Sequence, residues 1–209
     1  MVRRSKDLDP NAAVGHLFVL PDPRRPPPKF KNPTRPVWSE NKARFIARYL
    51  QYFVFVTYHG TYIDGFAGPQ KMRQPDLWTA KLVLESTPRW LQHFYLFDKR
   101  KDRYQALLRL KDTQPPRDKK KHEPQRTVEV VRGDFNVEVL KLLAARSIPL
   151  KEAVFCLLDQ HTFECRWDTV RALAQYPKAE YKNEILYFLP SYWLNRALSG
   201  IKKEWIVER

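Results

Sequence analysis

The segment Thr61-Tyr62-Ile63-Asp64-Gly65-Phe66-Ala67-Gly68 runs from a β-rich stretch through an aspartate into a turn with two glycines. β-Branched and aromatic residues favour a strand, whereas glycine allows a tight turn whose backbone can approach a ligand closely. Ligands of open parallel sheets bind beyond the carboxyl ends of the strands. The segment therefore indicates an α/β fold that carries a binding site directly after this strand.

Short β-rich runs and helical patterns alternate over most of the chain. The β-rich runs are residues 61–64, 93–98, 127–132, 153–159 and 184–189. Apolar residues recur at helical spacing in residues 76–86, 100–111, 135–146, 166–175 and 191–203. This alternation, with nearly continuous apolar strands, predicts a doubly wound, mostly parallel Rossmann-like sheet with helices on both faces.

The start of the chain has a different composition. Eight of the 17 prolines lie in residues 10–36, so residues 1–36 are expected to form a basic, Pro-rich arm rather than helices or central strands.

From Trp38 onward, helical spacing predicts an N-terminal helix. Its aromatic residues are expected mostly in the core: Trp38, Tyr52, Phe53, Phe55 and Tyr58. Residues 37–209 then form one α/β domain, in which residues 112–126 make a charged surface loop.

Positive charge is concentrated in the first part of the chain. The formal net charge of the 209 residues is +15, and residues 1–126 contribute +14 of it. A basic surface of this kind predicts a nucleic acid partner, either DNA or RNA, because neutralised phosphates release their counterions. A solvated basic tail without a specific partner accounts for the same charge equally well, so both interpretations stay open.

Cysteine content and hydropathy indicate the cellular compartment. The two cysteines cannot form a disulfide framework, and neither an apolar leader nor a run of 18 apolar residues is present. We therefore expect a cytoplasmic protein with no membrane span. His161 and Cys165 match no closed zinc spacing, so no metal site is expected.

Four predicted strands have an aspartate at or just beyond their carboxyl ends. These residues are Asp64, Asp98, Asp134 and Asp159. Aspartate is a common helix N-cap after a strand, which is a sufficient explanation for any one of them. Four in succession at one edge of a parallel sheet favour a shared ligand site.

The glycine spacing narrows the class of ligand. It is G-x-x-G rather than G-x-G-x-x-G, and no Gly-Lys-Ser/Thr follows, so a nicotinamide-dependent oxidoreductase is the weaker hypothesis. An acid before the glycines suits a cationic ligand with a ribose, and we predict S-adenosylmethionine. Asp64 is expected near its amino-acid portion, and the backbone of Gly65-Phe66-Ala67-Gly68 close to it. Asp98 is expected to accept from the ribose hydroxyls, and Asp134 with Phe135 to hold the adenine.

The chain resembles the three-Cys-motif partner family, within the class I S-adenosylmethionine-dependent methyltransferases. The resemblance covers roughly residues 38–200, and Tyr62-Ile63-Asp64-Gly65-Phe66-Ala67-Gly68-Pro69 is its most specific motif. The other matching segments are Lys42-Ala43-Arg44-Phe45-Ile46 with Tyr49-Leu50, Leu157-Leu158-Asp159, Trp167-Asp168-Thr169-Val170 with Ala172-Leu173, and Glu184–Leu189 with Asn195-Arg196.

The resemblance implies a methyltransferase-like fold, S-adenosylmethionine as cofactor and a genetically linked partner protein with three cysteines. A complete sheet of this class has two strands beyond the fifth, so we expect a fragment or a reduced form of it. The sequence departs from the pattern of the family at one residue and in one short segment. Gln70 replaces a glycine, and Asp159-Gln160-His161-Thr162 replaces Asp-Pro-x-Gly.

Two hypotheses about function follow. In the first, the chain methylates nucleic acid, and Asp159 is the catalytic residue that orients the nucleophilic nitrogen for attack on the methyl group. In the second, the chain is a catalytically inactive methyltransferase-like module that binds nucleic acid or the three-Cys-motif partner protein. The departure after Asp159 favours the second hypothesis, whereas the motif after the first strand favours the first.

Overall fold

The computed structural model describes residues 37–149, 151–176 and 182–189. The predicted arm 1–36 and the predicted helix 191–203 lie outside them. The helices are α1 (Val37–Thr57), α2 (Thr79–Glu85), α3 (Lys101–Asp112), α4 (Phe135–Ala144) and α5 (Trp167–Gln175). The strands are β1 (Gly60–Asp64), β2 (Leu91–Asp98), β3 (Thr127–Arg132), β4 (Val154–Leu158) and β5 (Glu184–Tyr187). None of these helices combines the length and the apolar character that crossing a bilayer requires.

The five strands form one sheet in the order β3-β2-β1-β4-β5, and every neighbouring pair is parallel. In the central strand β1, Asp64 is in register with Leu96 of β2 and with Leu157 of β4. The order of the strands reverses at β1, so the carboxyl edge between β1 and β4 is the topological switch point. The predicted doubly wound parallel sheet is confirmed.

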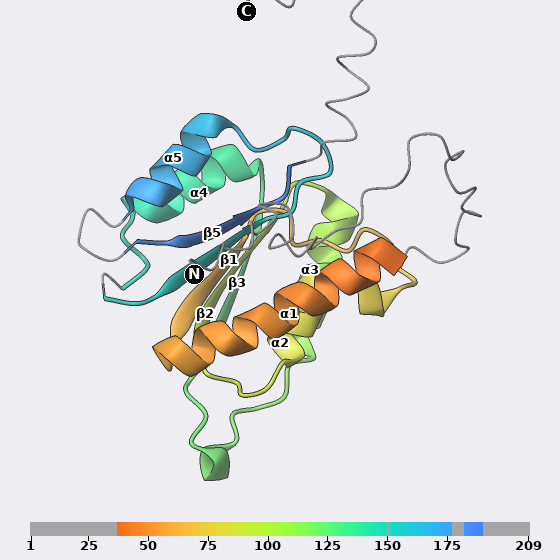
Figure 1. Ribbon diagram of the computed structural model, residues 1–209. Coiled ribbons are helices and arrows are strands. Elements are labelled where there is room, and N and C mark those ends of the chain that lie inside the picture. Colours follow the sequence, from red (N-terminus) through yellow and green to blue (C-terminus); the bar gives the residue numbers. More distant parts are fainter. Residues whose placement is uncertain (1–36, 150, 177–181, 190–209) are drawn as a thin grey trace, which may run out of the picture. The chain divides into compact units, whose positions relative to one another are not determined.

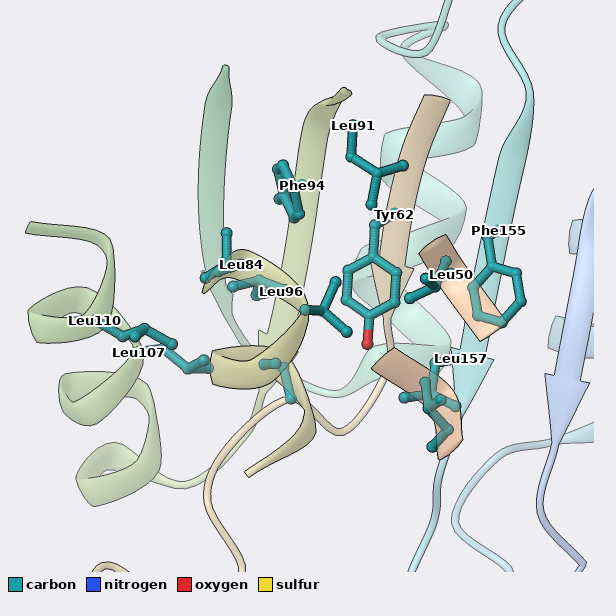
Figure 2. Packing of buried hydrophobic residues seen from close by; sticks show 14 of the residues in the cluster. Leu50, Tyr62, Leu84, Leu91, Phe94, Leu96, Leu107, Leu110, Phe155 and Leu157 are labelled. Carbon is teal, nitrogen blue, oxygen red and sulfur yellow. The ribbon is translucent and has the colours of Figure 1, made fainter. Parts of the chain in front are cut away.

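Helices cover both faces of this sheet (Figure 1). One buried cluster joins α1, α2 and α3 to one face, and a second cluster joins α4 and α5 to the other. Neighbouring residues of β1 alternate between the two, because Tyr62 belongs to the first cluster and Ile63 to the second. Figure 2 shows Tyr62 in the first cluster among Leu50, Leu96 and Phe155.

Helix α1 buries an aliphatic stripe and exposes aromatic side chains. The prediction that its aromatic residues are mostly in the core is wrong, because the exposed fraction is 58% for Tyr52, 53% for Phe55 and 72% for Tyr58 just after the helix. A helix against a sheet buries one stripe of residues three or four apart. Here the stripe is Ala43, Ile46, Leu50 and Val54.

Helix α2 begins at Thr79, three residues later than predicted. Residues Pro75–Leu77 form a separate 3₁₀ turn instead, and Trp78 is extended. The indole Nε1 of Trp78 donates a hydrogen bond to the carbonyl oxygen of Ala67 at 2.6 Å. This contact ties the start of α2 to the glycine-containing turn after β1.

We expect Phe155→Ala to destabilise the domain by about 3–5 kcal/mol, the usual range for truncating a buried phenylalanine. Phe155 is fully buried, and its ring centroid lies 5.7 Å from that of Phe53 and 6.2 Å from that of Tyr62. Urea unfolding measures the change. Phe163→Ala is the control, because Phe163 is 49% exposed and its truncation leaves no cavity. Equal losses in both variants would contradict this packing.

Candidate functional site

The turn after β1 is hydrogen-bonded to both neighbouring strands. The backbone N–H of Gly65 donates to the carbonyl oxygen of Leu157 in β4 at 3.0 Å. The N–H of Ala67 donates to the carbonyl oxygen of Phe97 in β2 at 2.9 Å. The turn therefore lies across the carboxyl edge of the three central strands, where parallel sheets bind their ligands.

Both glycines of this turn stand where a side chain would crowd its neighbours. A Cβ at Gly68 would lie 2.2 Å from Oδ2 of Asp98 and 2.5 Å from Cβ of Arg103. A Cβ at Gly65 would lie 3.0 Å from the ring of Phe135. Glycine at these positions is thus explained by the close approach of the turn to its neighbours.

Asp64 lies beneath the turn, with only 1% of its surface exposed. Its carboxylate accepts hydrogen bonds from the Tyr62 hydroxyl at 2.9 Å and from the N–H of Phe66 at 3.1 Å. Burial raises the pKa of Asp64, the nearby carboxylates of Asp159 and Asp98 add to the rise, and its two hydrogen-bond donors oppose it, so that the pKa is about 7. Its predicted contact with the amino-acid portion of a cofactor stays a prediction.

Asp98 ends β2 and lines a cavity of about 260 Å³. Its carboxylate accepts from the N–H of Arg100 at 2.8 Å and from the N–H of Gly68, and it lies 3.8 Å from the guanidinium of Arg103. Burial raises the pKa of Asp98, while these donors and cations oppose the rise. A carboxylate accepts up to about four hydrogen bonds, so Asp98 keeps acceptor capacity toward the cavity.

Asp134 and Phe135 begin the next helix at the same cavity. The exposed Asp134 caps α4 by accepting from the N–H of Asn136 at 2.8 Å, and this hydrogen bond lowers the pKa of Asp134. Phe135 is only 3% exposed, and its ring packs against Phe97 and Phe66 with centroids 5.2 and 5.7 Å apart. Phe135 thus forms part of the cavity wall, with most of its ring in the core.

The cavity of about 260 Å³ joins five of the predicted residues from three turns. They are Gly65, Phe66, Asp98, Asp134 and Phe135. The other predicted residues line two further hollows among the described residues. Asp64, Ala67, Gly68 and Asp159 line one of about 20 Å³, and Asp159 also lines one of about 330 Å³. Phe66 borders all three spaces, so the predicted residues line neighbouring spaces around one side chain.

Asp159 forms an ion pair that the sequence did not indicate. Its Oδ1 lies 2.7 Å from Nζ of Lys42 in α1, and the side chains are 11% and 12% exposed. The same Nζ lies 5.1 Å from the ring centroid of Phe188, just after β5. Lys42 is 117 residues from Asp159 in the chain. The sequence offers one indication of Lys42, which is that it lies in a segment that carries the family resemblance.

Cations are a second feature that sequence reasoning missed. Lys99, Arg100 and Arg103 line the cavity beside Asp98. They follow β2 directly and belong to the turn into α3 and its first turn. The three consecutive basic residues Lys99, Arg100 and Lys101 were the available signal, but the sequence alone did not show that two of them face the cavity.

Asn136 joins the turn after β3 to the loop after β4. Its Nδ2 donates to Asp134 at 2.9 Å and to the carbonyl oxygen of Glu164 at 2.8 Å. Its Oδ1 accepts from the N–H of Arg166 and from the hydroxyl of Thr169, both at 2.8 Å. Asn136 is 5% exposed and makes all the hydrogen bonds that an amide side chain offers, so it fixes the two loops relative to each other.

Metal-binding residues are not grouped at this site. In residues 37–149, 151–176 and 182–189, no three His, Cys, Asp or Glu side chains are clustered in a way that would hold a metal ion. Burial raises the pKa of Cys165 to about 11, so its sulfur is a thiol at neutral pH.

Comparisons of the chain with models of protein families, with curated proteins and with solved structures found no match. The function is therefore inferred from the residues and geometry of the site.

We expect Asp64→Asn to change the pH dependence of stability. Between the ordinary Asp pKa and about 7, the folded protein binds a proton at Asp64 that the unfolded chain does not bind. The wild type therefore loses stability relative to the variant as the pH rises from about 4 to about 7, by up to about 1.4 kcal/mol per pH unit. Urea unfolding across this range measures the difference.

Asp168→Asn is the control for this experiment, because the Asp168 side chain is 87% exposed. Its stability profile should run parallel to that of the wild type. A parallel profile for Asp64→Asn as well would show that Asp64 titrates normally in the folded protein.

Proposed function

We propose that the chain is an S-adenosylmethionine-dependent methyltransferase-like protein of the three-Cys-motif partner type, and that it acts on nucleic acid. One observation carries the proposal. The turn Gly65–Gly68 is hydrogen-bonded to β2 and β4 beside a cavity lined by Asp98, Asp134 and Phe135. This combination supports a ligand with a ribose and an aromatic base at the switch point of the sheet.

The residues present fit this cofactor in three respects. The absence of a Cβ at Gly68 leaves room for the turn to approach Asp98 within hydrogen-bond distance. Asp98 would hold the ribose hydroxyls, and the backbone of Gly65–Gly68 and Asp64 would lie at the amino-acid portion. Asp134, whose pKa is lowered, stays ionised and would accept from the adenine amine beside the edge of Phe135.

The bound cofactor would supply a methyl group already activated by the sulfonium charge. The chain then has to position the acceptor and exclude water, which are the main contributions of protein to such a reaction. Asp159 lines the hollow of about 330 Å³ next to the cofactor cavity and would orient a substrate amine by accepting its hydrogen bond. Lys42 holds the Asp159 carboxylate in place at 2.7 Å.

Nucleic acid as the substrate is supported by the cations around this hollow. Lys71 and Arg103 line it together with Asp159 and Glu164, so a phosphate backbone would find two cations beside the reacting group. Phe66 lines the same hollow and would present an aromatic surface to a base.

A second candidate function is a binding module without methyl transfer. The ion pair between Lys42 and Asp159 favours it, because a nearly buried pair is costly to break and engages the carboxylate that would orient the substrate. In this case the chain binds nucleic acid or the three-Cys-motif partner protein, and the cofactor cavity has only a structural or regulatory role.

We expect calorimetric titration to show S-adenosylmethionine binding to the wild type, and at least about 10-fold weaker binding to Asp98→Asn, because hydrogen bonds to a charged acceptor contribute about 1.5–3 kcal/mol. Asp168→Asn should bind like the wild type, since its exposed side chain lies on α5. No heat of binding with the wild type, or equal affinity in Asp98→Asn that unfolds normally in urea, would refute the cofactor assignment.

Transfer of labelled methyl groups to DNA or RNA decides between the two candidate functions. If the chain is an enzyme, Asp159→Asn should lower the transfer rate by about 10²-fold or more, the scale of a positioned acid–base group. Its affinity for S-adenosylmethionine should change little. A wild type that binds the cofactor but labels neither nucleic acid would favour the binding module.

A further inference from the structure

A second cavity, of about 230 Å³, lies where the strands β2 and β3 begin, at the edge of the sheet opposite the candidate site. Arg89 precedes β2, and Arg126 directly precedes β3. The loop between α3 and β3 covers the cavity and contributes Gln114 and Arg117, and the last turn of α3 contributes Lys111. Figure 1 shows this loop extending from the sheet between α3 and β3. We call it the basic pocket.

Positive charge dominates the basic pocket. Four cationic side chains line it: Arg89, Lys111, Arg117 and Arg126. The buried carboxylate of Glu123 forms an ion pair with one of them, because its Oε2 lies 3.1 Å from Nη1 of Arg89. Arg117 donates from Nε to the backbone carbonyl oxygen of Glu123. One carboxylate against four cations leaves the pocket with a net positive charge.

Buried polar atoms in the basic pocket have no partner among the described residues. They are Nε of Arg89, Nε of Arg126 and Oε1 of Gln114. Buried polar groups in folded proteins are almost always hydrogen-bonded, and an unmade bond costs about 1–3 kcal/mol. Two guanidinium groups at one cavity thus have donor capacity that the described residues leave unused, which favours an anion as the occupant.

Arg126 is held rigidly at the floor of the basic pocket. Its guanidinium carbon lies 4.5 Å from the ring centroid of Phe94, and its Nη1 donates to the carbonyl oxygen of Leu84 at 3.1 Å. Burial lowers the pKa of Arg126, the charge of Arg89 adds to this shift, and Glu123 opposes it, so that the pKa is about 10. Such a guanidinium is still charged at neutral pH and gains from a dianion in place of water.

We propose that the basic pocket binds a phosphoryl group. Guanidinium groups match the tetrahedral oxygens of phosphate with paired N–H donors, and a phosphate offers enough acceptors for several cations at once. Three prolines of the loop, Pro115, Pro116 and Pro124, restrict the backbone around the pocket, so its shape is largely preformed. Free phosphate esters and the nucleic acid backbone share this chemistry. The proposal does not depend on the cofactor or on methyl transfer.

Titration of the full chain with inorganic phosphate at constant ionic strength tests the proposal. We expect binding that raises the melting temperature of the wild type, and at least about 10-fold weaker binding in Arg117→Gln, from the loss of one charge-assisted contact. Arg117 is the variant of choice because its side chain is exposed, whereas Arg126 also packs against Phe94. Arg126→Lys, which keeps the charge but loses the planar donor pair, should weaken binding as well.

Lys120→Gln is the matched control, because it removes one charge from the same loop at an exposed position outside the pocket lining. It should bind phosphate like the wild type. Absence of phosphate binding to the wild type below about 10 mM, or equal weakening by Lys120→Gln and Arg117→Gln, would overturn the proposal.

A labelled single-stranded oligonucleotide identifies the source of the phosphoryl group. Displacement of the oligonucleotide by phosphate, together with weaker oligonucleotide binding in Arg117→Gln alone, supports the pocket and assigns it to the nucleic acid backbone. Phosphate binding that leaves the oligonucleotide unaffected also supports the pocket and assigns it to a free phosphate ester.

Discussion

The hydrogen bonds of the turn after β1 to both neighbouring strands are the constraint on which the candidate site depends. Gly65 donates to β4 and Ala67 to β2, so the turn has to lie flat across the carboxyl edge of the sheet. In that position a side chain at Gly68 would collide with Asp98. The turn also covers Asp64 and excludes water from it, which raises the pKa of this carboxyl. Close packing of the turn thus sets both the shape and the electrostatics of the site.

Charge is divided between the two edges of the sheet. The carboxyl edge carries Asp64, Asp98, Asp159 and the α4 cap Asp134 together with Lys42, Lys99, Arg100 and Arg103, so charges of both signs meet there. The opposite edge carries the basic pocket, where one buried glutamate faces several cations. The first edge therefore suits a ligand that carries charges of both signs, and the second suits an anion.

Much of the fold could be predicted from local patterns. Most of the strands are largely apolar, and the helices between them have an apolar stripe, so their order already indicates a doubly wound parallel sheet. The predictions failed for two features that depend on tertiary packing, namely the buried face of α1 and the first residue of α2. The spacing of α1 does not show whether aliphatic or aromatic residues face the sheet, and Tyr52 and Phe55 are exposed. At the start of α2, the hydrogen bond from Trp78 to Ala67 joins residues that are 11 positions apart, and no local signal predicts it.

The sequence by itself determined that the acids follow strands and that glycines follow the first of them, since both are local features of strand and turn chemistry. Only the tertiary structure decided which groups meet there. Lys42 reaches Asp159 across 117 residues, and Arg89 and Arg126 converge on one pocket from the segments before two different strands. The physical reason is that parallel strands place the ends of distant segments at a common edge, whereas side-chain partners depend on the packing of helices over that edge.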